Sequence, residues 1–188
     1  MGYTTDFVGH IDIHPPLSAA ECEYLTAFKE SRRCQRPGGR YAVPGNPFAE
    51  EALPVAQSNA VALGQPSLWC HWEPCPQGCC LSFDGLEKSY APVDWLRYLI
   101  QHFLKPRAAA ALSDEEWFTG FTFDHVLEGM VVGCRRDNKE LFAINVRNNR
   151  VSTKILRAAP DTYGDGWSLP YEVNNDRALA ARERRRRQ

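Results

Sequence analysis

The sequence predicts a single α+β domain in which an antiparallel sheet, arranged as two meanders, packs against two main helices. Apolar residues recur at helical spacing near residues 18–33 and 92–104. Shorter segments rich in branched and aromatic residues are separated by turn dipeptides such as Asp84-Gly85 and Asn148-Asn149. Connections this short make neighbouring strands antiparallel, so both runs of strands are expected to form meanders.

The first elements are a strand and a helix. Residues 7–14 read as a strand that ends at Pro15-Pro16. Ser18 and Glu21 form an S-x-x-E capping box, and apolar residues at helical spacing follow, so we expect a helix from Ser18 to about Arg33. A long irregular loop should follow at 37–66, since this segment has five prolines and little periodicity, and it is a candidate lid or partner-binding segment.

The middle of the chain predicts a meander followed by the second helix. Its three short strands are expected at 68–74, 80–83 and 86–90, with Asp84-Gly85 as the last turn. Pro92 opens the helix near its first position, a broad apolar face follows, and Pro106 ends it. This face indicates a helix that lies on a sheet.

The second meander is expected after an alanine-rich connection. Its strands are predicted at 120–126, 130–136, 141–146 and 151–156. Asp124 and His125 are neighbours on the first of these strands and would point to opposite faces. With 188 residues the chain suits one domain with a substantial core, which we place at 1–172, followed by a basic tail at 173–188.

Composition limits the class of partner and the compartment. The 22 Lys and Arg residues nearly balance the 23 Asp and Glu residues, so the whole chain is not an electrostatic nucleic-acid binder. The tail is a local exception, because it has a cluster of arginines. The cluster predicts, as an alternative, binding to nucleic acid or to an acidic partner. Its members are Arg182, Arg184, Arg185, Arg186 and Arg187. We find neither a leader-like start nor a stretch of 18 apolar residues, and the cysteine count is odd at seven. A cytoplasmic protein without a membrane partner is therefore expected.

Residues 68–80 read LWCHWEPCPQGCC and contain four of the cysteines. If residues 75–78 form the hairpin loop, Pro74 faces Cys79 and Trp72 faces Leu81. Alternation then divides the segment between two faces. The apolar face is expected to carry Cys70, Trp72, Cys79, Leu81 and Phe83, and the polar face Trp69, His71, Glu73, Cys80 and Ser82.

This register argues against a metal centre. Cys70 would lie roughly 13 Å along the ladder from Cys79, too far to share a tetrahedral site. Only Cys75, Cys80 and His71 remain as a partial ligand set, and the spacings are not those of a zinc knuckle. The sequence therefore predicts no metal and no cofactor, with the hairpin cysteines acting as small apolar side chains.

The same register places His71, Ser82 and Glu87 in one row across three strands. A hydrolytic triad needs the histidine between the serine and the carboxylate, whereas here the serine is central. A structural hydrogen-bond row is the preferred interpretation.

The chain resembles a group of uncharacterised proteins of actinobacteria and their phages in four stretches. These are MGYTTDF at 1–7, GQPSLWCHWEP at 64–74, DGLEKSY at 84–90 and WLRYLIQHFLKP at 95–106.

The resemblance covers roughly residues 1–160 and implies no activity. That group has an aromatic residue where this chain has Ser89 and a tryptophan where it has Phe83, and it lacks the extra hairpin cysteines. Its occurrence in phages implies a role in host interaction or counter-defence.

The leading functional prediction is a non-enzymatic intracellular module that binds a protein or small ligand. Its site would be the polar hairpin face, covered by the loop 37–66, and its residues are Trp69, His71, Glu73, Ser82, Glu87, Lys88 and Tyr90. The alternative is a small hydrolase or nucleotide-modifying enzyme that uses His71, Glu73 or Glu87 as acid or base.

Overall fold

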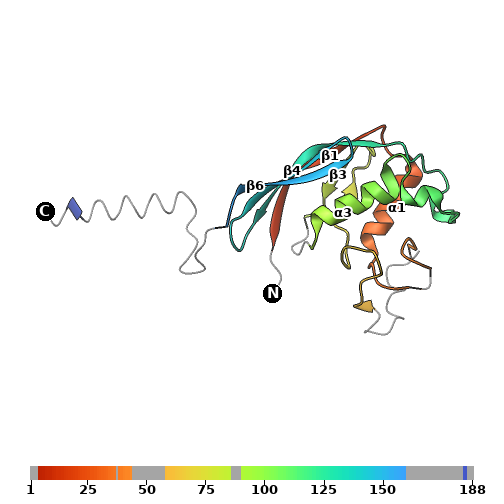
Figure 1. The fold of residues 1–188 in the computed structure, drawn as a ribbon, viewed down its shortest axis with the longest axis horizontal. Coiled ribbons are helices and arrows are strands. Elements are labelled where there is room, and N and C mark those ends of the chain that lie inside the picture. The colour runs from red at the N-terminus through yellow and green to blue at the C-terminus, as the bar shows by residue number, and fades with distance from the viewer. Residues whose placement is uncertain (1–3, 37, 44–57, 86–89, 160–183, 186–188) are drawn as a thin grey trace.

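The computed structural model describes residues 4–36, 38–43, 58–85, 90–159 and 184–185. These residues form one six-stranded sheet and two main helices (Figure 1). The strands are β1 (Thr5–His14), β2 (Trp72–Pro74), β3 (Cys80–Phe83), β4 (Val126–Arg135), β5 (Leu141–Arg147) and β6 (Arg150–Arg157). The helices are α1 (Ala19–Glu30) and α3 (Pro92–Leu99), with the π-helical turn η2 (Ile100–Leu104) and the 3-10 turns η3 (Ala109–Leu112) and η4 (Glu116–Phe118).

The α+β prediction is confirmed: the strands form one antiparallel sheet, in which β1 lies between the β2–β3 hairpin and the β4-β5-β6 meander. Their order is β2-β3-β1-β4-β5-β6, and all described pairings are antiparallel. The N-terminal strand β1 joins the two expected groups, because it pairs with β3 on one side and with all ten residues of β4 on the other. Local sequence patterns do not reveal this long-range pairing.

Helix α1 begins as its capping box predicts. The Ser18 hydroxyl accepts a hydrogen bond from the Glu21 N–H at 3.2 Å, and the Ser18 N–H donates to the Glu21 carboxylate at 2.7 Å. The helix ends at Glu30, three residues earlier than expected, because Ser31 is extended and its hydroxyl donates to the Phe28 carbonyl. The helical spacing of apolar residues does not show that the Ser31 hydroxyl competes for one of the last carbonyls of the helix.

Helix α3 begins at Pro92, as predicted, and the expected remainder of the helix continues as η2. The Lys105 N–H donates to the Ile100 carbonyl at 3.1 Å, which closes the wider π-type turn just before Pro106. The apolar face predicted from spacing is buried, with Trp95, Leu96 and Phe103 fully inaccessible.

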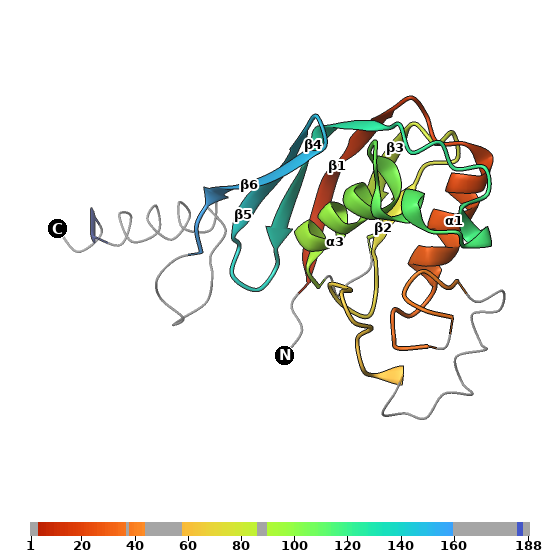
Figure 2. The same cartoon turned by 45° about the vertical axis from the view of Figure 1, so that its right-hand side comes forward.

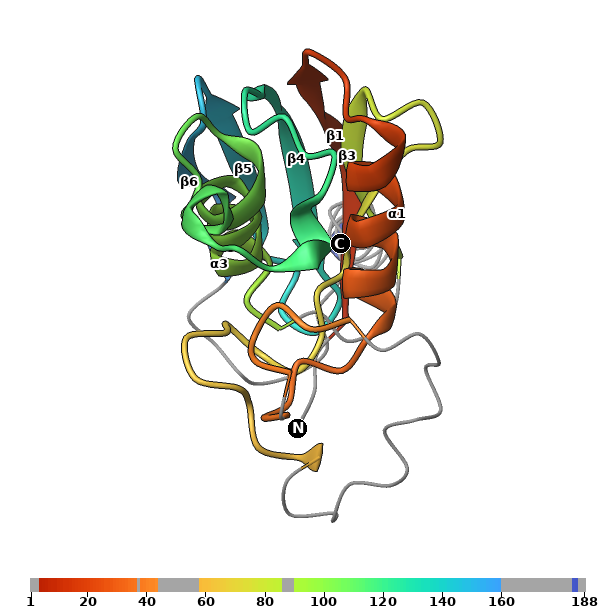
Figure 3. The same ribbon diagram turned by 90° about the vertical axis from the view of Figure 1, so that its right-hand side faces the viewer.

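Both helices lie on the same face of the sheet (Figure 3), α1 in front of β1 and β3 and α3 in front of β5 and β6. An aromatic core fills the space between them, in which the rings of Tyr24 and Phe28 on α1 meet Phe103 at 5.3 and 5.2 Å. In the described part of the chain, no helix covers the other face of the sheet (Figure 2). None of the described helices is long and apolar enough to cross a membrane.

Several expected boundaries are wrong or lie outside the described residues. Residues 121–125 are not a strand, and β4 starts at Val126 as one long strand that includes the expected gap before Met130. Only the last three residues of the expected strand 68–74 pair in the sheet. Three expected segments lie at least partly outside the described residues. These are residues 86–89 of the third strand expected in the first meander, residues 44–57 of the long loop, and all of the tail except 184–185.

Candidate functional site

The β2–β3 hairpin has a register two residues away from the predicted one. Trp72 pairs with Phe83 and Pro74 with Leu81, and the Cys75 N–H donates to the Cys80 carbonyl at 2.9 Å. The loop therefore comprises residues 76–79. Pairing of β3 with β1 determines this register, since Leu81 opposite Ile11 places two fully buried side chains on the core face.

A shift of two residues leaves most side chains on their predicted faces but moves Cys79. Cys70 and Trp72 are buried, as expected. Cys79, predicted to fill the core, lies in the loop and is exposed, so this assignment is wrong. Cys75 and Cys80 are partly exposed at the hairpin tip, as predicted.

His71 is buried beside a carboxylate that the sequence suggested only as a turn residue. Its Nδ1 lies 3.2 Å from Oδ2 of Asp84, and its carbonyl accepts from the Asp84 N–H at 2.9 Å. Glu73, and not His71, lies opposite Ser82, so the predicted row from His71 to Ser82 is wrong. Glu87, the third expected member, lies outside the described residues.

Lys29 of α1 connects this histidine to the rest of the polar hairpin face. Its Nζ lies 2.9 Å from a Glu73 carboxylate oxygen and 3.6 Å from Oδ2 of Asp84. Burial alone would lower the pKa of Lys29, but the hydrogen bond to Glu73 and the charge of Asp84 raise it above its ordinary value. The predicted ligand-binding groups His71 and Glu73 are thus engaged in an internal ion-pair network.

Two other predicted site residues, Trp69 and Tyr90, are exposed aromatic residues whose main-chain carbonyls lie near the same hydroxyl. The side chains are 37% and 48% accessible. The Ser67 Oγ lies within hydrogen-bonding distance of both main-chain carbonyls, 3.1 Å from that of Trp69 and 3.4 Å from that of Tyr90. Ser67 is itself fixed by the buried Trp95, whose indole N–H donates to it at 2.6 Å.

A cation adjoins one of these aromatic residues, Trp69. The guanidinium of Arg32 lies over the Trp69 ring, 5.7 Å from its centroid, at the C-terminal end of α1. We call Trp69, Tyr90 and Arg32 the aromatic patch. Its members come from three parts of the chain and supply two large exposed rings and a positive charge.

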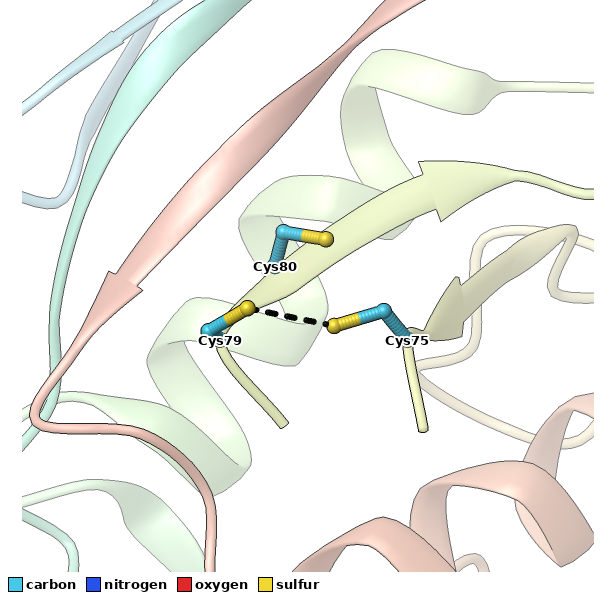
Figure 4. A group of neighbouring side chains, drawn as sticks. All are labelled: Cys75, Cys79 and Cys80. Carbon is cyan, nitrogen blue, oxygen red and sulfur yellow. Dashed lines mark hydrogen bonds between the residues drawn. The ribbon is translucent and has the colours of Figure 1, made fainter. Parts of the chain in front are cut away.

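Three thiols converge at the hairpin tip (Figure 4). The Sγ atoms of Cys75, Cys79 and Cys80 all lie within 4.8 Å of one another, and the first two are 3.5 Å apart. Burial alone would raise the pKa of Cys75, but hydrogen bonds from the other two thiols lower it to about 7. Burial and the neighbouring Cys75 raise the pKa of Cys80 to about 12. We call these residues the thiol cluster.

Sequence reasoning missed one further group, the buried pair of Glu21 and His125. Both side chains are inaccessible, and Oε1 of Glu21 lies 3.0 Å from Nε2 of His125. The Nδ1 of His125 lies 2.7 Å from the Pro15 carbonyl, so a doubly protonated ring can donate to both acceptors. The capping-box glutamate was the one local signal, since it places Glu21 at the buried start of α1.

The predicted site residues therefore separate into distinct groups. His71 and Glu73 meet Lys29 and Asp84, Ser82 faces Glu73 across the ladder, Trp69 and Tyr90 lie together, and Glu87 and Lys88 lie outside the described residues. The cavity between α1 and the hairpin tip and the cavity beside Arg36 and Arg40 have neither His71 nor Glu73 in their walls. No family model, curated protein or solved structure matches this chain.

Proposed function

We propose that the protein is a non-enzymatic intracellular binding module that recognises an acidic segment of another protein through the aromatic patch. The main support is that the exposed residues Trp69 and Tyr90 both place their main-chain carbonyls within hydrogen-bonding distance of Ser67 Oγ, which is itself anchored on Trp95. Interface hot spots are enriched in tryptophan, tyrosine and arginine, and the patch presents one of each. Groups that are already held in place lose less freedom on binding.

The charge of the patch favours an acidic partner. Arg32 adjoins Trp69, and the next turn of the chain adds the partly exposed Arg36. A carboxylate-bearing segment would interact with the guanidinium groups while its apolar side chains contact the rings. The resemblance to phage proteins extends the proposal to a partner from a bacterial host cell.

The alternative enzymatic function has less support from the geometry. His71 is 7% accessible and is engaged by Asp84, while its ring centroid lies 5.6 Å from that of Phe83. A general acid or base must reach the proton that it transfers, and this imidazole is directed at an internal carboxylate. Nucleic-acid binding by the arginine tail stays a prediction, since only Arg184 and Arg185 are described, as exposed residues.

A pull-down with matched tryptophan variants tests the proposal. Trp69→Ala and Tyr90→Ala remove the rings of the patch, whereas Trp117→Ala removes a ring of similar exposure, 43%, in η4. A partner identified by mass spectrometry should then be purified and titrated against each variant. We expect each patch variant to weaken binding by roughly 30-fold, corresponding to a hot-spot loss of about 2 kcal/mol, and Trp117→Ala to bind as wild type.

Salt provides the second readout. Affinity for an acidic partner should fall as ionic strength rises, because the Arg32 contact is partly screened. Equal affinities of Trp69→Ala, Tyr90→Ala and wild type would contradict the proposal. So would a partner whose affinity does not depend on salt.

A further inference from the structure

The thiol cluster brings together three metal-ligating side chains, of which the predicted register had separated Cys79 from the other two. Cys75 follows β2, Cys79 lies in the loop and Cys80 begins β3, and the three sulfur atoms occupy one small region at the tip (Figure 4). In the described part of the chain, they form the one group of three His, Cys, Asp or Glu side chains whose ligand atoms are this close.

The main chain holds the three cysteines in place from two directions. Within the hairpin, the Cys75 N–H donates to the Cys80 carbonyl and the Gly78 N–H donates to the Cys75 carbonyl, both at 2.9 Å. From outside, the Ile13 and Leu17 N–H groups donate to the Cys79 and Gly78 carbonyls at 2.8 and 3.0 Å. The tip is therefore fixed to the end of β1 and to the segment before α1.

We propose that Cys75, Cys79 and Cys80 form a binding site for a thiophilic metal ion, Zn²⁺ or Cu⁺, with all three sulfur atoms as thiolate ligands. Thiolates that share an ion at about 2.3 Å lie about 4 Å from one another. The observed limit of 4.8 Å and the Cys75–Cys79 separation of 3.5 Å bracket this value, so small side-chain rotations close the site.

The donor set and its surroundings favour a soft ion. All three ligands are sulfur, which suits Zn²⁺ and Cu⁺ and is unsuited to Mg²⁺ or Ca²⁺. Entry is open, since Cys79 is exposed and Cys75 lines a groove of about 470 Å³ between α1 and the tip.

The coordination number distinguishes the two ions. Three thiolates complete a trigonal Cu⁺ site, whereas Zn²⁺ prefers four ligands and would retain one position for water or another small ligand. Full-length protein, kept reduced with a phosphine that does not bind the ions strongly, should be titrated with each ion in competition with a coloured chelator. We expect one equivalent of at least one ion to bind. Binding of Zn²⁺ alone, Cu⁺ alone or both supports the site and identifies its ion.

Single substitutions locate the site. Cys75→Ser, Cys79→Ser and Cys80→Ser should each weaken binding by at least about 100-fold, since loss of a ligand should exceed the 10- to 100-fold effect of outer-shell changes. Cys134→Ser removes a partly exposed thiol of β4 outside the cluster and should bind as wild type. Cys79 is the most exposed of the three, so its variant is the least affected by folding defects.

A second measurement uses the wild-type protein. Alkylation followed by peptide mass spectrometry should show that the metal protects these three cysteines and leaves the modification of Cys134 unchanged. Failure of both ions to bind, equal affinity of Cys79→Ser and wild type, or protection elsewhere would overturn the proposal.

Discussion

Loss of the Glu21 charge from the buried Glu21–His125 pair should destabilise the protein more than any other single charge change in the described residues of α1. Both side chains are inaccessible to solvent, and Glu21 also accepts hydrogen bonds from the N–H groups of Ser18 and Thr122, at 2.7 and 2.8 Å. Glu21→Gln keeps the size of the side chain and removes its charge. The variant leaves His125 without its counter-charge in the core.

Two independent estimates of the loss agree. Burial would raise the pKa of Glu21, but its hydrogen bonds lower it from 4.5 to about 2. At about 1.4 kcal/mol for each factor of ten, the folded state favours the ionised carboxylate by about 3 kcal/mol. Removal of one partner of a buried ion pair costs about 3–5 kcal/mol in other proteins. We therefore expect Glu21→Gln to lose about 3 kcal/mol, and the Tm to fall by about 6–12 °C.

Urea unfolding at neutral pH, followed by circular dichroism, measures this loss. Glu23→Gln is the matched control, since Glu23 is an exposed residue in the first turns of the same helix. His125→Gln and the double variant complete a cycle, in which the double variant should lose at least about 1 kcal/mol less than the sum of the single variants. A loss for Glu21→Gln no larger than that for Glu23→Gln would refute the reasoning.

Two further predictions follow from the same structure. Stability should fall as the pH drops from 4.5 toward about 2, because folded Glu21 then gains a proton. It should also fall as the pH rises above 6.5 through the raised folded-state pKa of His125, because the imidazolium is then lost. Urea midpoints across this range should show both effects in wild type. Both should be smaller in the double variant, where the lowered pKa values of Asp6 and Asp137 still contribute to the loss at low pH. Gly78→Ala should lower the free energy of unfolding more than Gly85→Ala, although both glycines have a positive φ. A Cβ at Gly78 would lie 2.8 Å from the Leu17 carbonyl oxygen, whereas a Cβ at Gly85 would have no atom of the described residues within 4 Å. Equal unfolding midpoints for the two variants would contradict this.

Patterns confined to one element predicted the fold well. The S-x-x-E box and the apolar face from Trp95 to Phe103 identify helices whose starts agree with the structure, because caps and periodicity are properties of neighbouring residues. The turn at Asn148-Asn149 is likewise confirmed, since both residues adopt the positive φ that asparagine tolerates.

Features that depend on distant residues were not predicted. The hairpin register follows from the pairing of Leu81 with Ile11, a contact between segments far apart in the chain. The wrong register separated Cys79 from Cys75 and Cys80, so the thiol cluster was missed. In the same way, nothing near His125 in the sequence indicates that Glu21 would be its partner.

The central position of β1 has a consequence for how the chain folds. Thr5 pairs with Arg135 and His14 with Val126, so β1, which is made before β4, must wait for β4 before its second edge is filled. Contacts between segments this far apart slow folding, since the long intervening chain must be ordered before they form. During synthesis, Ile11 and Ile13 would remain without their β4 neighbours until β4 itself has left the ribosome.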